Sequence, residues 1–313
     1  MSNTIENLFG IPGASAPIQV RERIDGIPAQ AYPAVSAGYV FQLLLLKKLL
    51  RFLLGNPARR NAMLIGEPGV GKTSIVNEIA SRLNIPVFSL ACSGKTRFSH
   101  MVGGYEIVGG NTQWRDGPLV MAMRHGGIFL ANEITRLDSG EQMNLAEVLD
   151  SRASITIPDT GEVVMADPNF RFIATGNSGG YGDDSGVYQG ERISSVAFLD
   201  RFQVFKVGHM DATDEQALLQ KLAPSLPVAI VEGMVKLAGE VRKNFVGRGG
   251  TLRVIMSTRS LCVWAMETVG YSKISGIVDS AREALLDTSL NGAPEDEASA
   301  VLEIWDRWVK EGA

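Results

Sequence analysis

The sequence predicts an α/β protein in which a parallel sheet between helices is followed by a smaller all-helical domain. In the first two thirds of the chain, short apolar runs alternate with helix-periodic segments, as parallel strands joined by crossover helices do. In the last third the apolar runs stop and only helical periodicity remains. We therefore expect an extended arm over residues 1–33, a sheet domain over 34–208 and a helical domain over 209–313.

The composition is that of a soluble globular protein, because 45% of the 313 residues are apolar and 20% are charged. A formal net charge of −4 disfavours a protein dedicated to nucleic acids or anionic membranes. Cys92 and Cys262 lie far apart among apolar neighbours, which favours reduced thiols over a disulfide framework. The chain also starts without the basic and apolar segments of a signal peptide, so a cytoplasmic location is expected.

The most apolar segment, residues 39–55, is predicted to be a core helix and not a membrane span. Lys47, Lys48 and Arg51 interrupt it, and it is shorter than the ~20 apolar residues that a membrane crossing needs. The side chains expected on its buried face are the leucines at positions 43, 46, 50 and 53.

Five apolar runs in the sheet domain are predicted to be buried strands, over residues 62–65, 87–92, 127–131, 170–175 and 202–207. Helices are predicted between them over residues 73–83, 117–126 and 140–152. The alternation places the ends of successive parallel strands along one edge of the sheet, where α/β proteins bind ligands.

Amphipathic helices fill the last third of the chain, over residues 213–223, 227–245, 258–269, 274–290 and 295–309. Thr213 and Gln216 are expected to form a capping box at the start of the first of them. Trp305 and Trp308 fall on the apolar stripe of the last helix, which favours core packing over contact with a ligand.

A phosphate-binding loop is the most specific motif in the sequence. "GEPGVGKT", Gly66 to Thr73, matches G-x-x-x-x-G-K-[ST] between a predicted strand and a predicted helix. Its glycines let backbone N–H groups surround a phosphate at the positive end of the helix. Lys72 is then expected to reach the β- and γ-phosphates, and the Thr73 hydroxyl to ligate Mg²⁺. We expect ATP and Mg²⁺ at a site formed by Gly66, Glu67, Pro68, Gly69, Val70, Gly71, Lys72, Thr73 and Ser74.

Polar side chains follow two of the predicted strands at the same edge of the sheet. Glu133, after the apolar run 127–131, is a candidate to activate the water that attacks the nucleotide. Asn177, after the run 170–175, is a candidate to hold that water or the γ-phosphate. Each has a structural alternative, because Glu133 can cap the following helix and Asn177 can form an Asx-turn.

Together these motifs resemble the AAA+ ATPases, and more narrowly the MoxR-type branch. That branch includes the ATPase subunit of cobaltochelatase, the most similar to this chain, and the activators of Rubisco and nitric oxide reductase. The resemblance is carried by the phosphate loop and by residues 115–157 and 173–202, the second of which ends in "FLDRF". It implies an AAA+ core followed by a helical lid.

The resemblance implies a role for each strand-end residue. Gly66–Thr73 becomes the Walker A loop, Asn132 and Glu133 the Walker B pair, and Asn177 the first sensor. The Walker B position normally holds an aspartate, which acts one shell away from the metal. Asn132 keeps a carbonyl acceptor but lacks the charge, so the sequence predicts a working ATPase with a weakened hold on Mg²⁺.

Two arginines are implicated by the same resemblance. Arg201 in "LDRF" corresponds to the arginine finger that reaches the γ-phosphate of a neighbouring subunit, with a surface salt bridge as the alternative. Arg259, at the start of a lid helix, corresponds to the second sensor, and the nearby Arg253 competes for that role. An arginine suits this work because its guanidinium is planar and permanently charged.

The resemblance also marks two hairpin insertions. The first is expected over residues 100–118, where Tyr105 either packs within the hairpin or touches a client. The second is expected over 153–165, where Ile155/Ile157 and Val163/Met165 are expected to alternate around a turn. The glycine-rich loop 176–190 is expected to be mobile, with Asp183 and Asp184 solvated rather than bound to a metal.

The functional expectation is an ATP-hydrolysing ring, a hexamer by family resemblance, that remodels a protein client together with a von Willebrand A-domain partner. The alternative is a nucleotide-dependent scaffold with little hydrolysis, which only Asn132 favours. DNA translocation is disfavoured by the acidic charge balance.

Overall fold

The structure, a computed structural model, describes residues 3–56, 58–182 and 188–312, and it confirms the predicted fold class. A five-stranded parallel sheet has the strand order β2-β5-β8-β1-β9. Its strands are β1 (Asn61–Ile65), β2 (Val87–Ala91), β5 (Ile128–Asn132), β8 (Arg171–Gly176) and β9 (Gln203–Lys206). Each lies within one residue of an apolar run predicted to be a strand. The central strands β1, β5 and β8 are buried on both faces, which favours continuous apolar runs.

Helices cover both faces of this sheet and create two cores. One core contains α2 (Leu43–Leu54) and α3 (Lys72–Leu83). On the other face lie α4 (Phe98–Val102), α5 (Pro118–Arg124), η2 (Ile134–Arg136), α6 (Ser139–Asn144), α7 (Ala146–Leu149) and α8 (Val196–Leu199). Successive residues of β1 alternate between the cores, with Met63 in one and Ala62 and Leu64 in the other.

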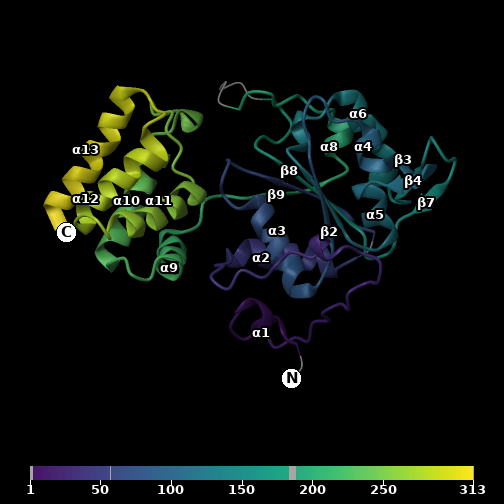
Figure 1. Cartoon of the computed structure of the whole chain (residues 1–313), viewed down its shortest axis with the longest axis horizontal. Helices are drawn as coiled ribbons and strands as arrows, with labels where there is room; N and C mark the ends of the chain where they lie inside the picture. Colours follow the sequence, from purple (N-terminus) through teal and green to yellow (C-terminus); the bar gives the residue numbers. More distant parts are fainter. Residues whose placement is uncertain (1–2, 57, 183–187, 313) are drawn as a thin grey trace.

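The arm folds back over the first core (Figure 1). It contains a short helix, α1 (Ile5–Phe9), and a 3₁₀ turn, η1 (Ala29–Ala31), so it is not extended throughout as the sequence predicted. Phe9 and Ile18 are buried against α2 and α3. The backbone N–H of Arg21 donates to the carbonyl of Leu83 at 3.0 Å, which fastens the arm to the end of α3.

Two antiparallel hairpins project from the sheet domain. The first pairs β3 (Gly103–Val108) with β4 (Asn111–Asp116), and the second pairs β6 (Ser154–Thr156) with β7 (Val163–Met165). The second hairpin is present as expected, and Ile155 and Ile157 on its first strand are both buried. Val164 lies opposite Ile155 and is buried too, whereas Val163 and Met165 are more than half exposed. The turn 158–161 brings Ile157 to Glu162, and in this register Val163 and Met165 lie on the other face of the hairpin from Ile155.

The last third of the chain is a separate helical lobe (Figure 1). It contains α9 (Ala212–Leu222), α10 (Val228–Lys243), η3 (Val246–Arg248), α11 (Thr258–Tyr271), α12 (Ile277–Leu285), the π-helical turn η4 (Leu286–Leu290) and α13 (Glu295–Gly312). Trp305 is fully buried and packs edge-on against Trp264 at 5.1 Å, so its predicted place in the core is confirmed. No helix among the described residues has the length and apolar character to cross a bilayer.

The predicted capping box at the start of α9 is wrong. The helix begins at Ala212, which puts Thr213 inside its first turn, and Asp211 occupies the N-cap position. Asp214 and Glu215 in the first turn still complement the positive end of the helix.

The predicted leucine stripe of α2 is correct at three of its four positions. Leu46, Leu50 and Leu53 are buried, but Leu43 is 45% exposed. Leu43 is the first residue of α2, where the helix starts beyond the edge of the core it covers.

This helix offers a matched test of the core. Replacing Leu46, which is completely buried, with alanine should lower the free energy of unfolding by ~2–5 kcal/mol, because the truncation leaves a cavity. The same change at Leu43 should alter it by less than ~0.5 kcal/mol. Urea unfolding followed by circular dichroism measures both, and equal losses would contradict the packing described.

Candidate functional site

The phosphate loop joins β1 to α3 at the edge of the sheet where the parallel strands end. Gly69 and Gly71 have φ values of +76° and +93°, a backbone region that side chains disfavour. At Gly69 a Cβ atom would also lie 2.3 Å from the hydroxyl oxygen of Ser257 in the helical lobe. The glycines therefore serve both the curl of the loop and its close contact with the lobe.

Lys72 is the first residue of α3, and its ammonium group turns back into the loop. The residue is 7% exposed, and its Nζ donates to the carbonyls of Gly66 at 2.6 Å and Glu67 at 3.0 Å. A third bond goes to Oδ1 of Asn177 at 3.0 Å. Burial lowers the pKa of the ammonium group, while the charge of Glu133 opposes that shift. Phosphate oxygens would be stronger acceptors for this buried cation than the neutral carbonyls.

Asn132, at the end of β5, accepts a hydrogen bond from the hydroxyl of Thr73 at 2.7 Å. The Thr175 hydroxyl lies 3.5 Å from the same Oδ1 atom. The amide thus supplies the acceptor that an aspartate would supply, and it orients the Thr73 hydroxyl without adding a negative charge.

The oxygen atoms of this corner fit Mg²⁺, a hard cation that prefers oxygen ligands. Thr73 is the residue that would ligate the ion, and Asn132 would act through Thr73 and metal-bound water. Among the described residues, no group of three His, Cys, Asp or Glu side chains could hold a metal.

Glu133 directs its carboxylate into the same corner. Its φ of +57° is unusual for a residue other than glycine and turns the chain sharply after β5. Nδ2 of Asn177 donates to its Oε2 atom at 2.7 Å, and Arg136 lies 3.7 Å away. Burial raises the pKa of the carboxyl group, while the charges of Lys72 and Arg136 oppose the shift. Glu133 precedes η2, but its side chain makes no capping bond there.

Asn177 links the two charged groups. Its carboxamide oxygen accepts from Lys72 and its nitrogen donates to Glu133, so both ends of the amide are used. The three residues follow three different strands of the sheet, β1, β5 and β8. The structure therefore brings together the strand-end residues that the sequence singled out.

Arg201 lies apart from this cluster. It follows α8, and its Nε donates to Oδ1 of Asp150 at 2.8 Å, while Nη1 donates to the carbonyl of Ala197 at 2.5 Å. The ion pair is the predicted structural alternative for this arginine. The Asp150 side chain is 55% exposed, so the pair lies at the surface.

Arg259 is next to the phosphate loop. It is the second residue of α11, and its backbone N–H donates to the carbonyl of Gly69 at 3.3 Å. Arg259 lines a cavity beside the loop, whereas Arg253 is not among the lining residues. The backbone N–H of Arg253 instead donates to Glu297 at 2.5 Å.

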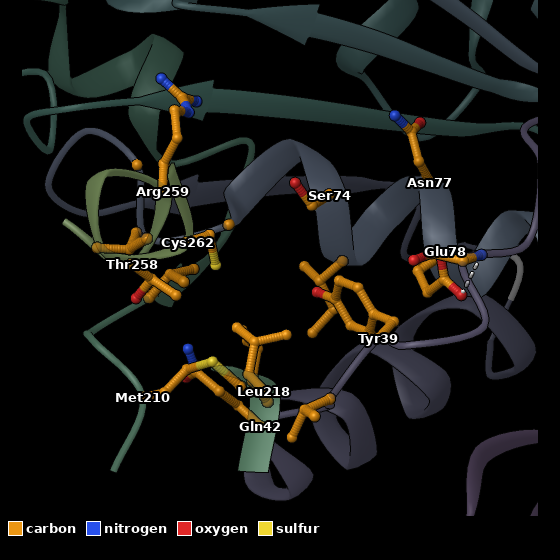
Figure 2. Close-up of a pocket in the computed structure, with 18 residues that line it drawn as sticks. Tyr39, Gln42, Ser74, Asn77, Glu78, Met210, Leu218, Thr258, Arg259 and Cys262 are labelled. Carbon is orange, nitrogen blue, oxygen red and sulfur yellow. Dashed lines mark hydrogen bonds between the residues drawn. The ribbon is translucent and has the colours of Figure 1, made fainter. Parts of the chain in front are cut away.

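That cavity, of about 420 Å³, was not predicted from the sequence. Tyr39 faces Thr258 and Cys262 across it, with Ser74 and Leu218 on the remaining sides (Figure 2). Apolar side chains such as Leu45, Ile75 and Leu218 line it together with polar ones such as Gln42 and Asn77. This mixture suits a flat aromatic ligand with polar edges, such as a nucleotide base. The walls come from the segment before α2, from α3 and from the helical lobe, so no single stretch of sequence marks the cavity.

A second cavity of about 310 Å³ lies on the other side of the loop, lined in part by Asn177, Lys206 and His209. Asp183 and Asp184, expected to be solvated, lie outside the described residues.

Tyr105 is 55% exposed and packs edge-on against Trp114 at 5.3 Å, and its hydroxyl donates to the carbonyl of Asp159 at 3.3 Å. Tyr105 therefore packs within the hairpin region, as one of the two alternatives expected, and its contact with a client stays a prediction.

Comparison with known proteins identifies the fold independently. Residues 61–202 match the family model of the AAA domain, dynein-related subfamily. A RuvB mutant of Thermotoga maritima has a similar fold, with a TM-score of 0.51 and 14% identity, over 82% of this chain and 72% of RuvB.

Two curated relatives are similar over longer stretches. The chain is 26% identical to the aerobic cobaltochelatase subunit CobS of Sinorhizobium sp over 284 residues, which cover 88% of this chain and 82% of CobS. It is 28% identical to the denitrification regulatory protein NirQ of Stutzerimonas stutzeri over 58% of this chain and only 63% of NirQ. Residues 61–202 are therefore similar to the AAA domain of the dynein-related subfamily, and the chain is similar to CobS and NirQ.

Proposed function

We propose that this protein binds ATP with Mg²⁺ and hydrolyses it as a MoxR-type AAA+ ATPase. The observation that carries the proposal is the chain of hydrogen bonds from Lys72 through Asn177 to Glu133, beside the bond from Thr73 to Asn132. It puts a cation, an oriented amide and a carboxylate around one corner of the phosphate loop. These are the groups that phosphoryl transfer to water requires.

Each group has a distinct role in the proposal. Lys72 holds the β- and γ-phosphates in place of the loop carbonyls, and the cavity beside Tyr39 holds the base. Glu133 accepts a proton from the attacking water. Asn177 orients that carboxylate and the water toward the γ-phosphate. Mg²⁺, when bound, draws charge from the phosphate oxygens. Arg259 contacts the nucleotide of its own subunit.

We propose further that the active site is completed between subunits of a ring, with six as the expected number. Arg201 lies at the surface and is not part of the cluster around Lys72, which suits a residue that serves a neighbour's nucleotide. The resemblance to the MoxR-type branch implies a protein client that the ring remodels or activates, together with a von Willebrand A-domain partner. The competing proposal is a scaffold that binds ATP but scarcely hydrolyses it, favoured by the missing charge at Asn132.

Replacing Glu133 with glutamine should reduce phosphate release at least ~10²-fold, because the water loses its proton acceptor. ATP binding should persist, since Lys72 and the loop are intact. Steady-state phosphate release and nucleotide titration measure the two properties. Glu303→Gln, an exposed change on α13, is the control. Equal rates in the wild type and Glu133→Gln would favour the scaffold.

Mixing two inactive variants tests the shared site. Arg201→Ala alone should lower the rate of ATP hydrolysis ~10³–10⁵-fold, because the charge of the transition state is no longer neutralised. Adding Glu133→Gln chains should restore part of the activity, since some interfaces then join an intact Glu133 to an intact Arg201. Phosphate release across mixing ratios measures the rescue. A mixture no faster than its separate components would argue for a self-contained site.

Asn132→Asp should lower the Mg²⁺ concentration needed for half-maximal turnover by ~10-fold or more, because a carboxylate restores the missing charge beside the metal. Magnesium titration of the ATPase rate measures this change. Asn144→Asp, exposed on α6, adds the same charge away from the site and should leave the titration unchanged. A titration unaltered by Asn132→Asp would place residue 132 outside the reach of the metal.

A further inference from the structure

A buried ion pair lies in the helical lobe among otherwise apolar packing. Glu215 of α9 is 1% exposed and Arg242 of α10 is 8% exposed. The two carboxylate oxygens accept from Nη1 and Nη2 of the guanidinium group, each at 2.8 Å. Burying two charges is expensive, and such a pair contributes little net stability compared with well-packed apolar side chains. Stability alone therefore does not account for it.

The pair also holds the start of α11. The hydroxyl of Thr258 donates to Oε1 of Glu215 at 2.8 Å, and Nε of Arg242 donates to the carbonyl of Met256 at 2.5 Å. Hydrogen bonds to Glu215 and from Arg242 thus fix the position of residues 256–258. These hydrogen bonds join α9 and α10 to the residues at the start of α11, so the network sets how the three helices meet.

The segment fixed in this way is where the lobe touches the phosphate loop. The Ser257 side chain packs against Gly69, leaving no room for a Cβ atom, and the Arg259 backbone bonds to the Gly69 carbonyl at 3.3 Å. Thr258, Arg259 and Cys262 form one wall of the cavity in Figure 2. Burial raises the pKa of the Cys262 thiol to about 11, and the charge of Glu215 acts in the same direction.

We propose that Glu215 and Arg242 are positioning residues for nucleotide binding, which hold the start of α11 so that Arg259 and the cavity wall stay over the phosphate loop. Neither side chain lines the cavity, so any effect on nucleotide must pass through α11. The inference rests on the proposed function, because it assigns the lobe a part in holding the same ATP. It predicts that weakening the network lowers the affinity for ATP even where the lobe remains folded.

The test compares two ways of breaking the pair. Glu215→Gln removes one charge and leaves Arg242 buried without its partner, which also destabilises the lobe. The double variant Glu215→Leu/Arg242→Met replaces both charges with apolar groups of similar size, and therefore keeps the lobe folded while releasing Thr258. The matched control is Arg282→Met/Asp306→Leu, which removes a pair between α12 and α13 whose side chains are 42% and 41% exposed.

The dissociation constant of a fluorescent N-methylanthraniloyl ATP analogue, the KM and kcat for ATP, and the Tm are measured for every variant. In the double Glu215/Arg242 variant, the dissociation constant and KM should rise roughly 5- to 20-fold with little change in Tm. The control pair should change none of these quantities. A lowered Tm with unchanged dissociation constant and KM would show a merely structural role and overturn the inference.

The variant Arg259→Ala tests whether the Glu215/Arg242 pair affects nucleotide binding through α11. Combined with the Glu215/Arg242 variant, it should weaken binding much less than the product of the two separate losses, because both act through one contact. Fully multiplicative losses would overturn the inference. A wild-type chain that binds no nucleotide would overturn the proposed function, and the inference with it. Normal wild-type binding with unaffected variants would overturn the inference alone.

Discussion

The buried ammonium group of Lys72 is the constraint around which the site is built. A cation removed from water needs several acceptors, and here the curled loop supplies two carbonyls while Asn177 supplies an amide oxygen. Because that amide also donates to Glu133, one buried charge orients residues that follow three strands. The parallel sheet makes this arrangement available, since its strands all end at the same edge.

This arrangement also explains how an asparagine can stand in the Walker B position. The bond from Thr73 to Asn132 requires only an acceptor, and a carboxamide provides one. What changes is the charge at this corner: the carboxylates of Glu133, Glu191 and Glu67 act on Lys72, but position 132 adds no negative charge. Orientation of the Thr73 hydroxyl is therefore preserved, and we propose that the affinity for Mg²⁺ is the property that an asparagine at position 132 alters.

The sequence revealed those parts of the molecule that local patterns encode. Apolar runs located every strand of the parallel sheet, and contiguous motifs located Lys72 and Glu133. The cavity beside Tyr39 escaped prediction because its walls come from three distant segments. The pairing of Glu215 with Arg242 has no periodic signal, and the buried residue of β7 is Val164, which the alternation of Val163 and Met165 did not indicate.

The two arginines assigned to the nucleotide are held in different ways, and the difference fits their proposed roles. Arg259 is placed by its own chain, through the buried network at the start of α11. Arg201 is placed by an ion pair with a half-exposed aspartate, an interaction worth only ~0–1 kcal/mol. Exchanging Asp150 for a neighbour's phosphate therefore requires little energy, so the surface salt bridge is compatible with an arginine finger. In the ring we propose, this ion pair would keep the guanidinium group available to a second subunit.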